Sequence, residues 1–151
     1  MAVFEIDEEE RGAFFNTLKK FLVEKLRYSE KQASDIDLFS NRKEYFTLRF
    51  KRGFDDLYLK VGDYSYTAPD QKSIVVSRIG FKKNHKGSGT RLMKELCELG
   101  TKFEYEWLYV ECPNPDCQEF MKKLGFKGTD PIAIDKLKNS IQQYESLKQS
   151  Q

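Results

Sequence analysis

The apolar residues near the start of the chain keep the spacing of one helix face. They are Phe14, Leu18, Phe21, Leu22 and Leu26. This pattern predicts a helix over 8–27 with Asp7 as its N-cap. Ser29 can cap a second, shorter helix that ends near Phe39. Residues 3–6 alternate between apolar and polar, which predicts a short first strand.

Between residues 44 and 81 the pattern changes from helical spacing to runs rich in β-branched and aromatic residues. Strands are predicted over 45–50, 57–61, 64–67 and 73–81. Lys51-Arg52-Gly53 forms a turn between the first two strands, and 68–71 is a loop. Strands joined by short turns pair antiparallel, so this section predicts a meander.

In the second half of the chain, helix signals alternate with a strand signal. Helices are predicted over 89–100, from Asp116 to Gly125, and at about 130–148, and a buried strand over 107–110. Because a helix separates the strands at 73–81 and 107–110, these two strands should lie parallel with a right-handed crossover. The last helix is amphipathic, with Asp130 as its cap and Pro131 at its first position.

The composition is that of one globular domain. The chain has 151 residues, of which 39% are hydrophobic, enough to bury a core. Its 26 basic and 24 acidic residues leave a net charge of +2, which implies no general affinity for polyanions. No apolar run approaches the roughly 20 residues that span a bilayer, and the acidic start does not resemble a signal peptide. We expect a single α+β domain over 1–151, located in the cytoplasm, without a membrane partner.

The cysteines do not indicate a metal site. There are three of them, and Cys112 and Cys117 have the spacing CxxxxC instead of the CxxC of a zinc knuckle. His85 is the only histidine. We therefore expect no metal and three reduced thiols, as is usual in the cytosol.

A turn with two glycines connects the strand at 73–81 to the helix at 89–100. It reads Asn84-His85-Lys86-Gly87-Ser88-Gly89-Thr90. Glycines let the backbone N–H groups approach a ligand closely, and a helix N-terminus carries about half a positive charge. A strand, a glycine turn and a helix in this order can bind phosphate.

Two motifs in this region resemble the GNAT superfamily of acyl-CoA-dependent N-acyltransferases. The family's loop, Gln/Arg-x-x-Gly-x-Gly/Ala, corresponds here to the segment from Asn84 to Gly89. The positions of the family's second motif are occupied, with every spacing kept, by Leu108, Val110, Asn114, Cys117, Met121, Gly125 and Phe126. The resemblance covers about 73–127. It implies a three-layer α/β/α fold whose central mixed, mostly antiparallel sheet has a V-shaped splay between the strands at about 73–81 and 107–111.

The resemblance also implies a binding site for acetyl-CoA as co-substrate. Backbone N–H groups in the loop would hold the pyrophosphate, and Ile79 and Phe81 would pair with the pantetheine arm. Asn114 would hydrogen-bond the same arm. The residues implied in binding are Ile79, Phe81, Asn84, His85, Lys86, Gly87, Ser88, Gly89, Thr90 and Asn114. A diphosphate needs several donors at once, which a glycine loop can supply.

The catalytic residues are less apparent than the binding residues. Acyl transfer to an amine needs both a base and an acid. The tyrosine that commonly acts as the acid in this family is replaced here by Met121. Tyr109 and Glu111 are the remaining candidates, and being two residues apart on a strand they share one face. A tyrosine at a strand edge and a solvated glutamate, neither with a catalytic role, would give the same sequence pattern.

The expected function is an N-acetyltransferase that transfers an acetyl group from acetyl-CoA to a primary amine by direct attack in a ternary complex. The acceptor would be a small molecule or a protein. The alternative, motivated by Met121, is an inactive GNAT-fold protein that binds acyl-CoA or a partner. A member acting on charged transfer RNA is supported only by basic residues, so a nucleic-acid partner is not favoured. The final helix, where the family usually has a hairpin, could fill that side or mediate a homodimer.

Overall fold

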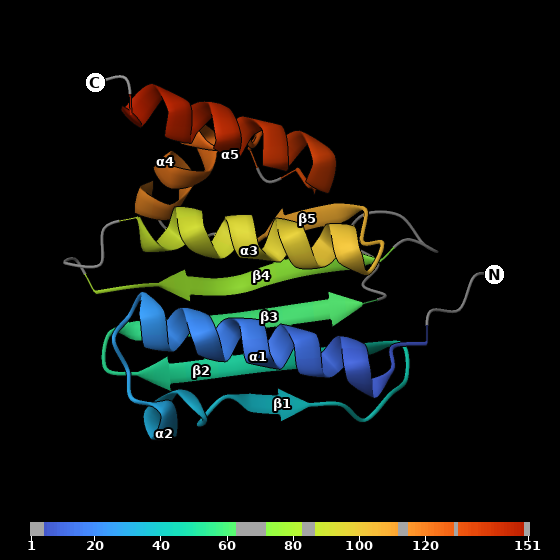
Figure 1. The fold of residues 1–151 in the computed structure, drawn as a ribbon. Helices are drawn as coiled ribbons and strands as arrows, with labels where there is room; N and C mark the ends of the chain where they lie inside the picture. Colours follow the sequence, from blue (N-terminus) through green and yellow to red (C-terminus); the bar gives the residue numbers. More distant parts are fainter. Residues whose placement is uncertain (1–4, 63–71, 83–86, 112–114, 129, 150–151) are drawn as a thin grey trace.

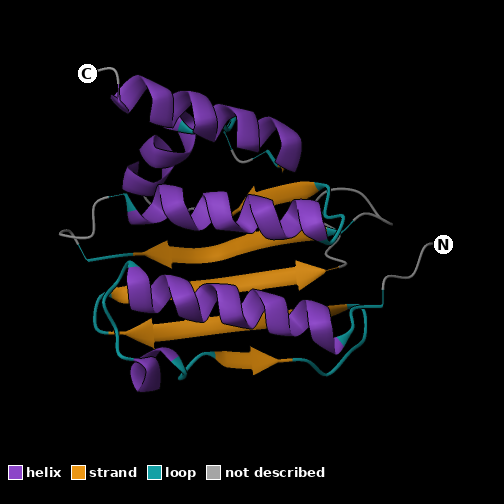
Figure 2. Cartoon of the chain, in the orientation of Figure 1, coloured by secondary structure: helices purple, strands orange, loops and turns teal. Residues whose placement is uncertain are grey.

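The computed structural model describes residues 5–62, 72–82, 87–111, 115–128 and 130–149. These residues form an α+β fold with a mixed sheet of six strands, ordered β1-β2-β3-β4-β5-β6, and five helices (Figures 1 and 2). The predicted fold class is therefore confirmed at this level. None of the helices described has the length and apolarity that crossing a membrane requires.

The first helix, α1 (Glu8–Glu24), begins as predicted, because the Asp7 side chain accepts a hydrogen bond from the Glu10 N–H at 2.9 Å. It ends three residues earlier than predicted, and Arg27 beyond it has a positive φ of 68°. The strand predicted over 3–6 does not form in the part of that range that the structure describes. Glu5 and Ile6 lie outside any strand, and residues 3 and 4 lie outside the described residues.

The second helix, α2 (Glu30–Ala33), is a single turn closed by a capping box between Ser29 and Gln32. The prediction that this helix reaches Phe39 is wrong. Residues Asp37–Phe39 form strand β1, which pairs antiparallel with β2 and has Leu38 opposite Leu48. Pairing along the edge of the sheet satisfies backbone groups that a longer helix would have paired internally.

The predicted meander is confirmed over its described strands: β2 (Tyr45–Arg52), β3 (Asp55–Gly62) and β4 (Ser73–Gly80) pair antiparallel in sequence order. Gly53 at the β2–β3 turn has a φ of 59°. The strand predicted at 64–67 and the loop at 68–71 lie outside the described residues.

The parallel pairing of the two strands on either side of the next helix is also as predicted. Helix α3 (Ser88–Lys102) leads to β5 (Trp107–Val110), which lies parallel to β4. Helix α4 (Pro115–Lys123) follows, and Gly125 beyond its end has a positive φ of 97°. Glycine adopts this conformation without the steric cost that other residues incur.

The last helix starts later than predicted, because Ile132–Ala133 form strand β6 against β5, with Ile132 opposite Leu108. Helix α5 (Ile134–Gln149) therefore does not begin at Pro131. It runs antiparallel beside α3 (Figure 1). The two helices pack closely at Gly100, where an added Cβ would lie 2.6 Å from Cδ1 of Ile134.

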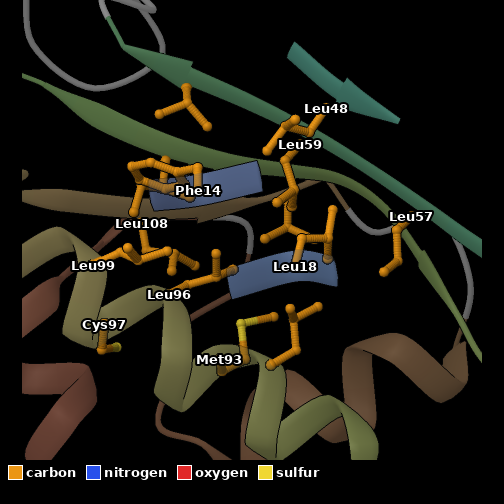
Figure 3. Close-up of a cluster of buried hydrophobic side chains, with 14 of the residues drawn as sticks. Phe14, Leu18, Leu48, Leu57, Leu59, Met93, Leu96, Cys97, Leu99 and Leu108 are labelled. Carbon is orange, nitrogen blue, oxygen red and sulfur yellow. The ribbon is translucent and has the colours of Figure 1, made fainter. Parts of the chain in front are cut away.

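The hydrophobic core lies between the sheet and α1 and α3, which cover the same face of the sheet (Figure 1). Figure 3 shows side chains from the three parts of this core: Phe14 and Leu18 from α1, Leu48, Leu57, Leu59 and Leu108 from strands, and Met93, Leu96, Cys97 and Leu99 from α3. On the other face of β2 and β3, Thr47, Tyr58 and Lys60 are half-buried and Arg49 is exposed. The described helices thus leave this face of β2 and β3 partly open, and the three-layer arrangement stays a prediction.

Candidate functional site

Strands β4 and β5 are neighbours only along the first half of β4. Their register runs from Ser73 opposite Trp107 to Val76 opposite Val110, and the Glu111 N–H donates to the Val76 carbonyl at 2.9 Å. Beyond this point β4 continues to Gly80 against β3 alone. The edge of β4 over 77–80, which we call the open edge, therefore pairs with no strand on its β5 side within the described part of the chain.

Helix α3 begins a few residues beyond the open edge. Its N-cap is Gly87, with a φ of 79° and no capping side-chain hydrogen bond. Ser88, the first helical residue, is 1% exposed, and its Oγ has no hydrogen-bond partner among the described residues. The first N–H groups of a helix lack internal partners and carry partial positive charge, so this N-terminus can bind an anion. The predicted loop residues Asn84, His85 and Lys86 lie outside the described residues.

Helix α4 contacts the first turn of α3. A Cβ added to Gly89 would lie 2.8 Å from Cζ of Phe120, so only glycine allows this approach without movement of the ring. Met121, at the position of the family's usual tyrosine, is 3% exposed and belongs to the hydrophobic core. Its side chain therefore packs the interior. Asn114, directly before α4, lies outside the described residues.

The two candidate catalytic residues lie on the face of the sheet opposite the core. Tyr109 is in register with Val75, which is in turn opposite Lys60 of β3. Glu111 directly follows β5, and its Oε1 forms an ion pair with Lys60 Nζ at 3.2 Å. The structure thus holds the Glu111 carboxylate in a fixed, half-buried position.

Arg91 joins the first turns of α3 to the end of α1. Its guanidinium lies 2.6 Å from Glu24 Oε1 and 3.2 Å from Glu95 Oε1. The hydrogen bond to Arg91 lowers the pKa of Glu24, whereas burial raises the pKa of Glu95. Beside this cluster is a groove of about 440 Å³ next to Gly87, lined also by Lys25 and Lys94. The sequence does not reveal that Lys25 is near the α3 N-terminus, because the two are far apart along the chain.

A second hollow, of about 630 Å³, lies at the opposite end of α3. Its lining residues include four acids, Glu5, Glu104, Glu106 and Asp135, and one base, Lys72. These acids and the negative end of the helix dipole disfavour an anionic ligand there. The N-terminus of α3 is therefore electrostatically the more favourable of the two places for a phosphate.

The cysteines differ from the expectation of three reduced thiols. Cys97 is free and buried, and burial raises its pKa to about 12, so it is a neutral core thiol. Cys117 is disulfide-bonded, so the prediction of a reduced thiol is wrong at this position. No group of three or more His, Cys, Asp or Glu residues is arranged to hold a metal ion in the part of the chain that the structure describes.

Asp55 is a buried carboxylate close to the end of the open edge. It is 4% exposed and accepts two hydrogen bonds, from the Tyr28 hydroxyl at 2.5 Å and from the Lys82 N–H at 3.0 Å. Burial, followed by the hydrogen bond to Asp55, raises the pKa of Tyr28 to about 12. No motif in the sequence indicates that Asp55 is a buried acceptor of these two hydrogen bonds.

The raised pKa of Tyr28 predicts a specific loss of stability in alkali. The folded-state pKa of about 12 exceeds the usual value of 10.0, so the contribution of neutral Tyr28 is complete below pH 10 and is lost as the pH rises towards 12. We expect the free energy of unfolding to fall more steeply over this range in the wild type than in Tyr28→Phe. Solvent screening should keep the difference below about 2 kcal/mol. Denaturant titrations at several pH values measure it, and equal slopes would contradict the prediction.

No family model matches this chain. One solved chain, from "The crystal structure of KacTA-DNA complex", is 17% identical to it, with the alignment covering 87% of this chain and 85% of that chain at a TM-score of 0.44.

Proposed function

We propose that this protein is a GNAT-type N-acyltransferase that transfers an acetyl group from acetyl-CoA to a primary amine of a small molecule or a protein. The observation that carries the proposal is the open edge of β4, which leads to an uncapped helix N-terminus at Gly87. Acetyl-CoA combines an extended arm with amide groups and a pyrophosphate. An unpaired strand edge suits the arm, and a helix N-terminus suits the pyrophosphate.

The residues present fit such a ligand. The buried Ser88 Oγ has no partner among the described residues and could donate to a phosphate oxygen, together with the N–H groups of the first turn of α3. Ile79 and Phe81 would offer backbone groups to the arm. The motifs alone add four further residues to the proposed acetyl-CoA site: Asn84, His85 and Lys86 of the loop, and Asn114 through its amide.

Bound acetyl-CoA would supply a thioester whose carbonyl carbon the amine attacks, giving an amide and the free thiol of coenzyme A. Two side chains on one sheet face are the candidates for the proton transfers. The Glu111 carboxylate would accept a proton from the amine, and the Tyr109 hydroxyl would donate one to the departing sulfur. Lys60 would orient Glu111 through their ion pair at 3.2 Å.

A second candidate is a protein that binds acyl-CoA or a protein partner without turnover. Two observations favour it: Met121 is buried in the core in place of an acid, and Glu111 is already paired with Lys60. Release of free coenzyme A in the presence of a panel of primary amines separates the two. Binding without release on any amine would support the second candidate and contradict the first.

Thermal and chemical unfolding with and without acetyl-CoA test the binding site. A ligand at 100 times its dissociation constant should add about 2.7 kcal/mol to the free energy of unfolding. Thr90→Glu should remove this gain. Thr90 is the third residue of α3, where a carboxylate favours the helix and therefore preserves the fold while repelling a pyrophosphate.

Thr90→Gln is the matched control, since glutamine has nearly the same shape as glutamate without its charge. It should keep most of the ligand-induced gain. These variants are better suited than Gly89→Glu, because any side chain at Gly89 would also displace the Phe120 ring. No stabilisation of the wild type by acetyl-CoA would contradict the proposed function.

A further inference from the structure

The segment that follows β4 is held on three sides by contacts that the motifs do not account for. The β3–β4 ladder ends where Asp56 lies opposite Gly80, because β3 begins at Asp55 after the turn. Beyond Gly80, Phe81 and Lys82 have no strand partner on that side in the part of the chain described. Without another contact, these two residues would be free to leave the direction of the strand.

Asp55 supplies the missing contact. Its Oδ1 accepts the Lys82 N–H at 3.0 Å, two residues beyond the last ladder pair of β4 with β3. Its Oδ2 accepts the Tyr28 hydroxyl at 2.5 Å, which fixes the carboxylate from the side of the loop after α1. Since Asp55 is only 4% exposed, water competes poorly for these bonds.

The intervening residue, Phe81, is fixed from the α1 side. Its ring lies 5.8 Å from the ring of the fully buried Phe21, measured between centroids. The segment from Ile79 to Lys82 is thus held by Asp55, by Phe21 and by the last ladder pair. Its other edge pairs with no strand within the described part of the chain.

We propose that Asp55 is a positioning residue for acyl-CoA. By holding Lys82, it keeps the backbone groups of Ile79 and Phe81 in the extended arrangement that pairing with the pantetheine arm requires. This inference rests on the proposed function and adds a residue to it that lies outside both motifs. Asp55 would act through the backbone of this segment and would not itself touch the ligand.

The test is the dissociation constant of acetyl-CoA, measured by isothermal titration at a temperature where every variant is folded. Asp55→Ala removes both bonds and should weaken binding at least tenfold. Asp55→Asn should bind within about threefold of the wild type, because its amide can accept from Lys82 and donate to the Tyr28 oxygen. Tyr28→Phe keeps the Lys82 bond. It loses the bond to Asp55 and the bond from the Tyr28 hydroxyl to the Arg52 carbonyl at 3.3 Å, so it should bind within about threefold of the wild type although it is destabilised.

A second pair of variants tests the same inference if the Asp55→Ala protein does not fold. Lys82→Pro deletes the N–H donor while Asp55 and Tyr28 remain, and Lys82→Ala changes the same side chain but keeps the donor. The proline variant should bind at least tenfold more weakly than the alanine variant. In hydrogen exchange, the amide of Lys82 should lose protection in Asp55→Ala and keep it in Asp55→Asn.

Three outcomes would overturn the inference. Asp55→Ala could bind as tightly as the wild type, Tyr28→Phe could weaken binding as much as Asp55→Ala does, or the two Lys82 variants could bind equally. Each of these leaves the proposed function standing, because the wild type still binds. A wild type that does not bind acetyl-CoA overturns both the proposed function and the inference.

Discussion

Replacing Lys72 with methionine should lower the free energy of unfolding by about 3–5 kcal/mol, because it leaves a buried carboxylate without its counter-charge. Lys72 Nζ lies 3.1 Å from Glu10 Oε1 and 3.0 Å from the Phe103 carbonyl, and the side chains of Lys72 and Glu10 are only 14% and 8% exposed. The Tyr105 hydroxyl donates to the other oxygen of Glu10. Chemical denaturation at neutral pH measures the loss.

The three groups should behave as one unit. The combined variant Glu10→Leu, Lys72→Met, Tyr105→Phe removes every polar side chain of the network and leaves only the Phe103 carbonyl, so we expect it to recover a large part of the stability that Lys72→Met loses. A Lys72→Met variant within 1 kcal/mol of the wild type would show that the pair is solvated and would contradict this prediction. The network joins α1, the start of β4 and the connection before β5, so its loss should also loosen that end of the sheet.

Gly62→Ala should destabilise the protein by roughly 2–6 kcal/mol, the sum of strain at a positive φ and of overpacking. Gly62, at the end of β3, has a φ of 123°. A Cβ there would lie 2.4 Å from the Glu44 carbonyl oxygen and 2.8 Å from the Tyr45 Cα. Both are backbone atoms, which cannot move aside without disturbing the pairing of β2 with β3.

Gly12→Ala is the matched control, because a Cβ at this position in α1 would meet nothing within 4 Å. Alanine is the better helix former, so this variant should gain about 0.5–1 kcal/mol. In denaturant titrations, Gly62→Ala should lower the free energy of unfolding and Gly12→Ala should raise it. A loss of less than 1 kcal/mol in Gly62→Ala would contradict the prediction.

Only part of the candidate site could be predicted from the sequence. The glycines at 87 and 89 indicated a phosphate-binding turn, and the structure places Gly87 in the left-handed conformation at the start of α3. Tyr109 and Glu111 were expected on one face of a strand. The ion pair of Glu111 with Lys60 was not foreseeable, because the two residues are 51 positions apart.

The contacts of Asp55 could not be predicted from the sequence either. Its partners Tyr28 and Lys82 are each 27 positions away, on opposite sides along the chain. Nothing in the sequence around Asp55 distinguishes it from a surface acid at a hairpin turn. Only the packing of the loop after α1 against the end of β4 makes it a buried acceptor.

The sequence by itself determined the elements whose signals are local. Helix α1 follows from apolar spacing and the Asp7 cap, the meander from its β-rich runs and turns, and the parallel crossover from the helix between β4 and β5. In each case the residues that define the element are neighbours along the chain, so periodicity and capping suffice to predict it.

The tertiary structure decided the features that depend on distant partners. Residues 37–39 and 132–133 became strands because an edge of the sheet was available to pair with them. The network of Glu10 joins residues 62 and 95 positions away. Hydrogen bonds and burial at such separations are fixed only when the whole chain packs, which is why no local pattern indicates them.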